Sequence, residues 1–169
     1  VGIVGMGRIG QAVARRCHYG FEMPVIYFNR SPKEVEVPAR QVDDLASLMS
    51  QADIIVVTVP GGAETFQLID AAALAEMNPN AVFINVARGD VVDETALIAA
   101  LTEGRIAAAG LDVYAREPLV PQELREMENV VLLPHLGTAA LEVREAMGQM
   151  ALDNVIAWAA GNAMPTRVG

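Results

Sequence analysis

The sequence predicts an α/β protein built on a doubly wound parallel sheet, with helices on both faces in a three-layer αβα arrangement. Short apolar runs alternate with segments of helical periodicity along the chain, the pattern of parallel strands joined by right-handed crossovers. The run at residues 53–59 is almost continuously apolar, as expected for a strand covered on both faces. At 169 residues, with 53% hydrophobic and 20% charged residues, the chain has the size and composition of one globular domain.

The individual strands and helices follow from periodicity and from the residues that begin and end helices. The expected strands are residues 1–4, 25–28, 53–59, 81–86, 107–113 and 130–133. The expected helices are residues 8–19, 43–50, 70–77, 93–102 and 139–160, with Gly20 and Gly104 ending two of them. We expect Ile9, Val13 and Cys17 on the apolar face of the first helix, and the Met and Trp residues of the last helix as core packing.

The glycine motif GMGRIG, which begins at Gly5 directly after the first apolar run, is the feature around which the chain is organised. Gly5 permits a tight turn, Gly7 lets the backbone approach a pyrophosphate, and Gly10 lets the helix pack closely on the strand. The N–H groups of Arg8 and Ile9 then point at the phosphates from the helix N-terminus, where the helix dipole favours negative charge. Because a strand precedes the motif and a helix follows it, we interpret it as the dinucleotide site of a Rossmann domain, not as a plain turn.

The segment after the second strand indicates which dinucleotide binds. In NAD-specific sites an Asp or Glu usually stands here and accepts a hydrogen bond from the ribose 2′-hydroxyl. This sequence has Asn29, Arg30 and Ser31 instead, with Lys33 nearby, and these residues offer donors and positive charge to a 2′-phosphate. The alternative is an ordinary solvated turn with one Arg. We expect NADP(H) as the cofactor, with NAD(H) as the second choice.

Further cofactor contacts are expected where the strand at 53–59 ends. Val59 and Pro60 stand at the carboxyl edge of the sheet, which is where ligands bind in open α/β sheets. Thr65 follows shortly after, and it either reaches a phosphate from there or caps a helix.

Charge and cysteine content restrict the partners and the location of the protein. The net charge of −9 argues against non-specific binding to nucleic acid or to an anionic membrane. No apolar stretch approaches the roughly 20 residues that span a bilayer. Cys17, His18 and His135 are the only Cys and His residues, so we expect no metal site. A single cysteine excludes an internal disulfide and fits a reducing, cytoplasmic compartment.

Three charged or titratable residues follow predicted strands at the edge where the cofactor should lie: Arg88, Glu117 and His135. Reduction of a 2-oxo acid needs one group to hold the carboxylate, one to polarise the carbonyl and one to supply a proton. The planar guanidinium of Arg88 suits the first two tasks, and His135 suits the third, with Glu117 orienting its ring. Each residue alone has an ordinary structural explanation, but their joint placement favours catalysis.

Several stretches, in the same order along nearly the whole chain, resemble the cofactor domain of the D-isomer-specific 2-hydroxyacid dehydrogenases. They are VGMGRIG from Val4, NVARG from Asn85 followed by VVDE, AGLDV from Ala109, EP at Glu117 and PHLG from Pro134. Within that family the chain is most similar to the NADP-dependent glyoxylate/hydroxypyruvate reductases, including the 2-ketogluconate reductases. Glu117 distinguishes it from the similar formate dehydrogenases, which carry Gln there.

The resemblance implies roles for particular residues. The catalytic set would be the three residues named above, of which Arg88 and His135 also contact the cofactor. Asp112 would bind the nicotinamide carboxamide, and the ring would be lined by Val86, Ala87 and Gly137. A small 2-oxo or 2-hydroxy acid would be the substrate, and the protein would be a homodimer. The stretch PGG from Pro60 departs from many family members, which carry bulkier residues there.

The chain begins inside its first strand, and we therefore expect it to be a fragment of a longer protein. Residues 1–161 would form the dinucleotide-binding domain, and residues 162–169 an exit segment toward a substrate domain. The resemblance implies that this substrate domain closes over the cofactor and helps to bind the substrate. The isolated chain should then bind a nucleotide but turn over poorly or not at all.

Three functions are compatible with these observations. In the favoured one, NADPH gives hydride to C2 of glyoxylate, hydroxypyruvate or a similar 2-oxo acid, and His135 protonates the oxygen. An NAD-linked D-2-hydroxyacid or phosphoglycerate dehydrogenase is disfavoured by the missing acid after the second strand. A non-catalytic nucleotide-sensing module, like the corepressors that resemble this family, is disfavoured by the intact set of Arg88, Glu117 and His135.

Overall fold

The computed structural model describes residues 1–167 and divides into two compact units. The first unit, Val1–Pro134, contains the sheet and most of the helices. The second begins at His135 and contains one long helix. The predicted end of the cofactor domain at residue 161 stays a prediction.

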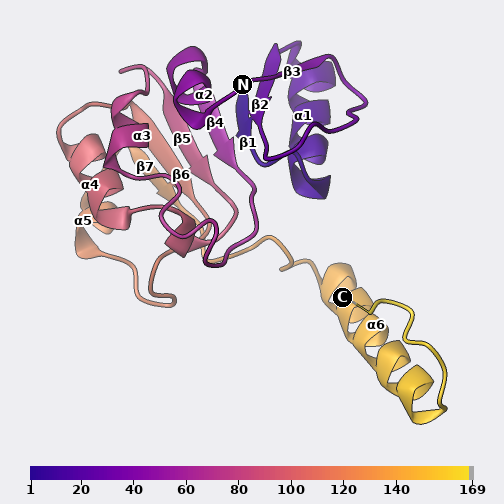
Figure 1. The fold of residues 1–169 in the computed structure, drawn as a ribbon. Helices are drawn as coiled ribbons and strands as arrows, with labels where there is room; N and C mark the ends of the chain where they lie inside the picture. The colour runs from indigo at the N-terminus through magenta and orange to yellow at the C-terminus, as the bar shows by residue number, and fades with distance from the viewer. Residues whose placement is uncertain (168–169) are drawn as a thin grey trace. The chain divides into compact units, whose positions relative to one another are not determined.

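The first unit is built on a seven-stranded sheet in the order β3-β2-β1-β4-β5-β6-β7 (Figure 1). All neighbouring strands are parallel, so their carboxyl ends meet at one edge. The strand order reverses between β1 and β4, and ligands bind beside such a reversal in open α/β sheets. The strands are β1 Gly2–Val4, β2 Val25–Phe28, β3 Ala39–Gln41, β4 Ile54–Val57, β5 Val82–Asn85, β6 Ala108–Leu111 and β7 Val130–Leu132.

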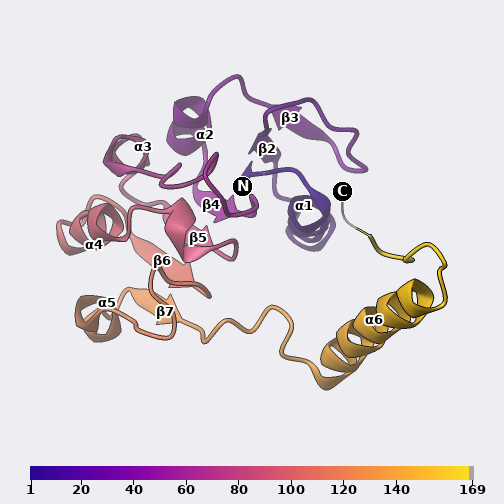
Figure 2. The same ribbon diagram turned by 60° about the horizontal axis from the view of Figure 1, so that its bottom comes forward.

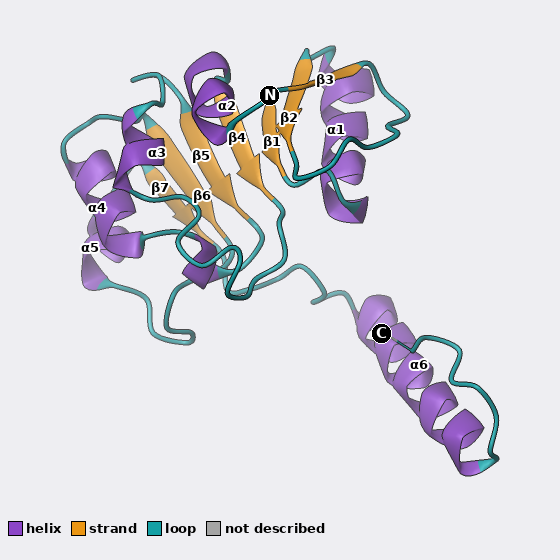
Figure 3. Ribbon diagram, in the orientation of Figure 1, coloured by secondary structure: helices purple, strands orange, loops and turns teal. Residues whose placement is uncertain are grey.

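Helices lie on both faces of this sheet, which confirms the predicted doubly wound α/β fold (Figure 3). Figure 2 shows α2, α3 and α4 in a row on one side and α1 on the other. The alternation along β1 explains this division, because Ile3 packs with Ala14 of α1 whereas Val4 packs in the core cluster that contains Leu48 of α2. The helices are α1 Arg8–Phe21, α2 Leu45–Gln51, α3 Ala71–Ala75, α4 Glu94–Thr102 and α5 Gln122–Glu126, with a 3₁₀ turn η1 at Gly89–Val91.

Helix caps explain where most of these helices begin. Asp44, Asp70 and Asp93 stand just before α2, α3 and α4, and each carboxylate accepts a hydrogen bond from a backbone N–H of the first turn. The predicted cap at Asp93 and the predicted end at Thr102 are both confirmed. The short strand β3 and the short helix α5 were not predicted from the sequence.

Two expectations about α1 are wrong. The helix runs through Gly20 to Phe21, and Glu22 ends it in the left-handed region with φ 55°. Its buried residues are Gly10 and Ala14, and Val13 packs partly buried against the same core cluster as predicted, while Ile9 is 60% exposed. The reason is the close approach of the helix to β1 at Gly10, which places small residues in that contact.

The second unit is formed by α6, Leu141–Ala159, and the segment that follows it. Asn154 holds this segment against the helix, because its amide donates to the Thr166 hydroxyl and accepts from the Thr166 backbone N–H. Within this unit no residue of α6 is buried, and Trp158 is 70% exposed. The Met and Trp side chains of this helix therefore form no core within the second unit, and their role as core packing stays a prediction.

Candidate active site

The glycine turn joins β1 to α1 at the carboxyl edge of the sheet, next to the reversal of strand order. Gly5 has a positive φ of 99°, and a Cβ added to it would lie 2.9 Å from the backbone nitrogen of Val59. Any other residue at position 5 would therefore be strained and crowded. The Gly5 N–H donates to the Phe28 carbonyl at 2.9 Å, which fixes the turn to the end of β2.

Gly10 is required by contact, not by its backbone conformation. A Cβ added there would lie 2.1 Å from the carbonyl oxygen of Gly5. The same carbonyl accepts a hydrogen bond of 2.6 Å from the Thr58 hydroxyl, which follows β4. Thr58 thus fixes the glycine turn from the β4 side. The sequence carries no signal for this role, because Thr is also an ordinary strand residue.

The N-terminus of α1 is open toward the edge of the sheet. Its N-cap is Gly7, and no side chain within the described residues caps it. A Cβ added to Gly7 would have no neighbouring atom within 4 Å, so a ligand can approach the backbone there. Arg8 and Ile9 form the exposed first turn. These features suit an anion at a helix N-terminus.

Asn29 supports the glycine turn from the β2 side. Its side-chain oxygen accepts a hydrogen bond from the Met6 backbone N–H at 3.1 Å, and its amide donates to the Ser31 carbonyl at 2.8 Å. The side chain therefore holds the turn and the loop after β2 together. Next to it, exposed Arg30 forms an ion pair with Glu64, a partner that no sequence signal indicated.

Val59, Pro60 and Thr65 belong to the loop that follows β4. Val59 packs against Gly5, since a Cβ added to Gly5 would lie 2.7 Å from Val59 Cγ1. The Thr65 hydroxyl donates to the Pro60 carbonyl at 2.6 Å and so closes the loop on itself. No helix begins at Thr65, which excludes the alternative of a helix cap.

Arg88 stands in a turn that is shaped by the buried side chain of Asn85. The Asn85 oxygen accepts a hydrogen bond from the Ala87 N–H, and its amide donates to the Arg88 carbonyl, both at 3.0 Å. Arg88 itself is exposed and donates from Nη1 to the Ala87 carbonyl at 2.6 Å. Exposed Val86 precedes buried Ala87 in this turn. Asn85 thus holds this turn in shape, and its position as a polar residue ending a buried strand is the sequence signal that could have identified it.

The aliphatic part of Arg88 lies against the loop after β4. A Cβ added to Gly61 would lie 2.9 Å from Arg88 Cγ. The departure from the family noted at Pro60-Gly61-Gly62 therefore has a local consequence, because the missing side chain at Gly61 leaves space that the Arg88 side chain occupies.

The loop after β6 carries Asp112 and Glu117. Asp112 is 8% exposed, and its backbone N–H donates to the Asn85 carbonyl at 3.0 Å. Oε1 of Glu117 accepts a hydrogen bond from the Tyr114 backbone N–H at 3.1 Å. The Glu117–Pro118 peptide bond is cis.

Tyr114 ties this loop to the end of β7. Its hydroxyl donates toward two carbonyls, Leu133 at 2.8 Å and Leu111 at 3.2 Å. Burial raises the pKa of the Tyr114 phenol above its ordinary value, with further contributions from the nearby Asp112 and Glu117 carboxylates. The ring is thus held as a neutral donor between two strand ends.

The Arg88 turn and the Glu117 loop are in direct contact. A Cβ added to Gly89 would lie 1.9 Å from the Tyr114 carbonyl carbon and 2.4 Å from the Ala115 nitrogen. Glu94, in the first turn of α4, accepts a hydrogen bond from the Ala115 N–H at 3.2 Å. The structure therefore brings together two of the three predicted catalytic elements through backbone contact at one edge of the sheet.

His135 and Gly137 belong to the second unit, and their assignment to the site stays a prediction. His135 has a positive φ of 56°, which is uncommon for a residue other than glycine and costs about 1–2 kcal/mol. Residues held in this region are frequent at functional sites.

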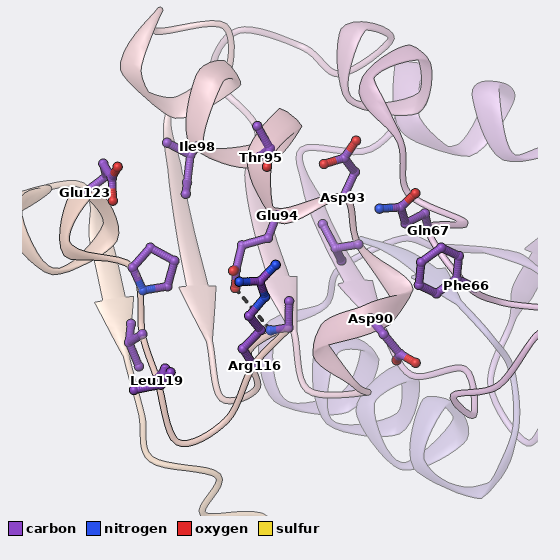
Figure 4. A pocket seen from close by; sticks show the side chains of 14 residues that line it. Phe66, Gln67, Asp90, Asp93, Glu94, Thr95, Ile98, Arg116, Leu119 and Glu123 are labelled. Atoms are coloured by element: carbon purple, nitrogen blue, oxygen red, sulfur yellow. Dashed lines mark hydrogen bonds between the residues drawn. The ribbon is translucent and has the colours of Figure 1, made fainter.

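A cavity of about 710 Å³ lies beside these loops, between η1, α4 and the segment after β6 (Figure 4). Its charged lining consists of Asp90, Asp93, Glu94, Glu123 and Arg116. None of the predicted catalytic or cofactor residues lines it, and the excess of carboxylates does not suit an anionic dinucleotide. The hydrogen bond from the Ala115 N–H to Glu94, dashed in Figure 4, joins two residues of this lining.

Residues 1–167 contain neither a side-chain cluster suited to a metal ion nor a helix suited to a membrane. No grouping of Cys, His, Asp and Glu has the arrangement that a metal ion would need. None of the helices in the same range has the length and apolar character required to cross a bilayer.

Comparison with known proteins shows which family the chain is similar to. Residues 1–137 match the model of the D-isomer specific 2-hydroxyacid dehydrogenase, NAD binding domain. Glyoxylate/hydroxypyruvate reductase B of Pectobacterium atrosepticum is 49% identical over 165 residues, which cover 95% of this chain and 51% of the relative. Glyoxylate reductase of Pyrococcus furiosus is 46% identical over 171 residues, covering 99% of this chain and 50% of the relative.

A solved structure agrees with these relatives. The NADPH-dependent glyoxylate/hydroxypyruvate reductase from Sinorhizobium meliloti, in complex with NADP and malonate, superposes with a TM-score of 0.95 at 40% identity. The match covers 99% of this chain and 52% of that one. This chain therefore spans about half the length of the relatives it matches. The chain belongs to the D-isomer-specific 2-hydroxyacid dehydrogenase family, and it contains that family's NAD-binding domain.

Proposed function

We propose that the protein reduces a small 2-oxo acid of the glyoxylate or hydroxypyruvate type to the D-2-hydroxy acid, with NADPH as the reductant. The observation that carries the proposal is the contact at Gly89, which joins the Arg88 turn to the Glu117 loop at the edge where the glycine turn also lies. This contact supports the proposal, because Arg88, which would bind the carboxylate, and Glu117, which would orient the proton donor, stand on adjacent loops.

The residues at the glycine turn fit a dinucleotide. The uncapped α1 N-terminus and the open space at Gly7 leave backbone N–H groups, including those of Arg8 and Ile9, available for a pyrophosphate. We propose that Val59, Pro60 and Thr65 line the same side, with Asn29 holding the turn in shape.

The preference for NADPH is supported by the residues after β2. The loop contains Arg30 and Ser31, both exposed, and no carboxylate in the place where NAD-specific sites carry one. The relative from S. meliloti is described as NADPH-dependent. NAD(H) is the alternative cofactor.

The chemical steps follow from the properties of the side chains. NADPH, when bound, supplies the hydride to C2. The Arg88 guanidinium would bind the substrate carboxylate and polarise the 2-oxo group. His135 would donate the proton to the oxygen, and Glu117 would orient its imidazole and favour the protonated form.

Four further roles rest on the family resemblance. Asp112 would bind the nicotinamide carboxamide, and the ring would lie against Val86, Ala87 and Gly137. Malonate and citrate, carboxylate ligands of the S. meliloti relative, support an acidic small-molecule substrate.

We also propose a cytoplasmic homodimer in which a substrate domain outside residues 1–169 completes the site. The isolated chain would then bind NADPH but turn over poorly.

The test is a comparison of two reactions catalysed by the complete protein. We expect NADPH to be oxidised on addition of glyoxylate or hydroxypyruvate, and NAD to be reduced more slowly, or not at all, with phosphoglycerate. Faster oxidation of phosphoglycerate with NAD would overturn the proposal in favour of that dehydrogenase. Tight NADPH binding without turnover of any 2-oxo or 2-hydroxy acid would indicate a nucleotide-sensing module.

A further inference from the structure

The exposed ion pair between Arg30 and Glu64 involves the residue that we propose to read the 2′-phosphate. Nη1 of Arg30 donates to Oε2 of Glu64. The two side chains are 82% and 77% exposed, so both are accessible to a ligand. Within residues 1–167, no second ion pair forms between the loops after β2 and β4.

The pair joins loops that lie on either side of the glycine turn. Arg30 follows β2, Glu64 follows β4, and β1 lies between these two strands in the sheet. Because the glycine turn follows β1 at the same edge, the two side chains meet across the site proposed for the dinucleotide.

Each loop is fixed by its own hydrogen bonds, which leaves the ion pair as a contact between side chains. Asn29 anchors the Arg30 loop through Met6 at 3.1 Å. Thr65 anchors the Glu64 loop through its hydroxyl bond to Pro60 at 2.6 Å. The two charged groups can therefore separate without movement of either backbone.

We infer that Glu64 is a specificity-determining residue whose carboxylate competes with the cofactor 2′-phosphate for Arg30 and so lowers the preference for NADPH over NADH. This inference rests on the proposed function, in which Arg30 reads that phosphate. A phosphate monoester carries a charge of about −1.5 to −2 near neutral pH, and it can use all the donors of the Arg30 guanidinium only where Glu64 releases Nη1. The uncharged 2′-hydroxyl of NADH does not compete with Glu64 for Arg30. Glu64 therefore lowers the affinity for NADPH but not the affinity for NADH.

The size of the effect is limited by exposure. Exposed ion pairs are weak, and loss of this one should tighten NADPH binding by about 2- to 5-fold. NADH binding should change by less than about 2-fold, since no charge is gained at that position. The NADPH gain should shrink as the ionic strength approaches 1 M, where the screening length is about 3 Å.

The experiment is a titration with NADPH and with NADH, followed by nicotinamide fluorescence, of the wild type, Glu64→Gln, Arg30→Ala and the double variant. Glu103→Gln is the matched control, because it removes the same charge from another exposed ion pair, with Arg105, at the end of α4. We expect Glu64→Gln to tighten NADPH selectively, the double variant to lose most of that gain, and Glu103→Gln to leave both affinities unchanged.

The outcomes separate this inference from the proposed function. If Arg30→Ala weakens NADPH selectively while Glu64→Gln leaves NADPH unchanged or weakens it, the inference is overturned and the reading of the phosphate by Arg30 stands. If Arg30→Ala weakens both cofactors equally or neither, then the proposed NADPH recognition fails, and the inference fails with it. If Glu64→Gln and Glu103→Gln tightened NADPH binding equally, the cause would be the change in net charge and not the ion pair with Arg30. That result would also overturn the inference.

Discussion

The contact at Gly89 offers the sharpest structural perturbation, because replacement by alanine would force two backbone segments apart. The added Cβ would lie 1.9 Å from the carbonyl carbon of Tyr114, 2.0 Å from its oxygen and 2.4 Å from the nitrogen of Ala115. All three are backbone atoms, so no side-chain rotation can relieve the overlap. To reach an ordinary contact distance of 3.4 Å, the Arg88 turn and the Glu117 loop must separate by about 1.5 Å.

This displacement should cost both stability and activity. Overpacking typically costs 1–3 kcal/mol, and with backbone on the opposing side we expect Gly89→Ala to lose about 2–4 kcal/mol of unfolding free energy. For a domain of this size that corresponds to a decrease in Tm of about 5–15 °C. A catalytic displacement of about 1 Å can cost about 10²-fold, so kcat/KM of the complete protein should fall by that order.

The assays are thermal and denaturant unfolding, steady-state kinetics and NADPH titration. Gly20→Ala is the control, because its added Cβ meets no atom within 4 Å and lies inside α1. That variant should be as stable as the wild type or more stable by up to about 1 kcal/mol, since alanine is the better helix former. If Gly89→Ala retained wild-type Tm and kcat/KM, the close packing of the two loops, and its role in placing Arg88 and Glu117, would be refuted.

Three further predictions concern single side chains. His135→Ala should leave NADPH affinity nearly intact while lowering kcat by about 10²–10⁴-fold, as measured by titration and steady-state rates, and an unchanged kcat would remove His135 from the mechanism. Tyr114→Phe should lose about 1 kcal/mol in denaturant unfolding at neutral pH, because the Leu133 carbonyl loses its donor. Since burial raises the pKa of Tyr114, its neutral form contributes stability that is fully present below the unfolded pKa of about 10 and is lost as the pH rises through the folded pKa. The stability advantage of the wild type over Tyr114→Phe should therefore decrease at strongly alkaline pH, and an advantage that stays unchanged there would contradict the assignment. Asp93→Ala should cost about 1 kcal/mol through loss of the α4 cap to Ala96, whereas unchanged unfolding would show that the cap is dispensable.

The glycine turn shows why part of the site could be predicted from the sequence. Gly5 and Gly10 occupy their positions because the backbone there leaves no room for a side chain. Both glycines belong to one short, contiguous motif, so the motif alone predicts them. The same holds for the Asp93 cap, where one residue meets the backbone of the next turn. Signals of this kind act over a few residues and need no knowledge of the tertiary structure.

Residues that act across the sheet escaped prediction. Thr58 holds the Gly5 carbonyl from a neighbouring strand, and Glu64 reaches Arg30 across β1. The Tyr114 hydroxyl joins the ends of β6 and β7. Hydrophobic periodicity counts Tyr as an apolar residue and so gives no sign of this hydrogen bond. Each contact depends on strand order, which a linear pattern does not contain.

Elements with little apolar periodicity were also missed. β3 at the sheet edge has no fully buried residue, and its sequence of Ala, Arg and Gln carries no strand signal. The face of α1 was predicted by spacing, but the close approach at Gly10 places small residues against β1 and leaves Ile9 exposed. Tertiary packing, not helical period, decided which side was buried.

The most direct test of the central claim is to follow the hydride itself. The complete protein would be incubated with hydroxypyruvate and NADPH that carries deuterium in both positions at C4 of the nicotinamide, and the product would be examined by NMR and chiral chromatography. We predict D-glycerate with one deuterium at C2. Recovery of unchanged hydroxypyruvate, or of glycerate without deuterium at C2, would contradict the proposal that this protein is an NADPH-dependent 2-oxo acid reductase.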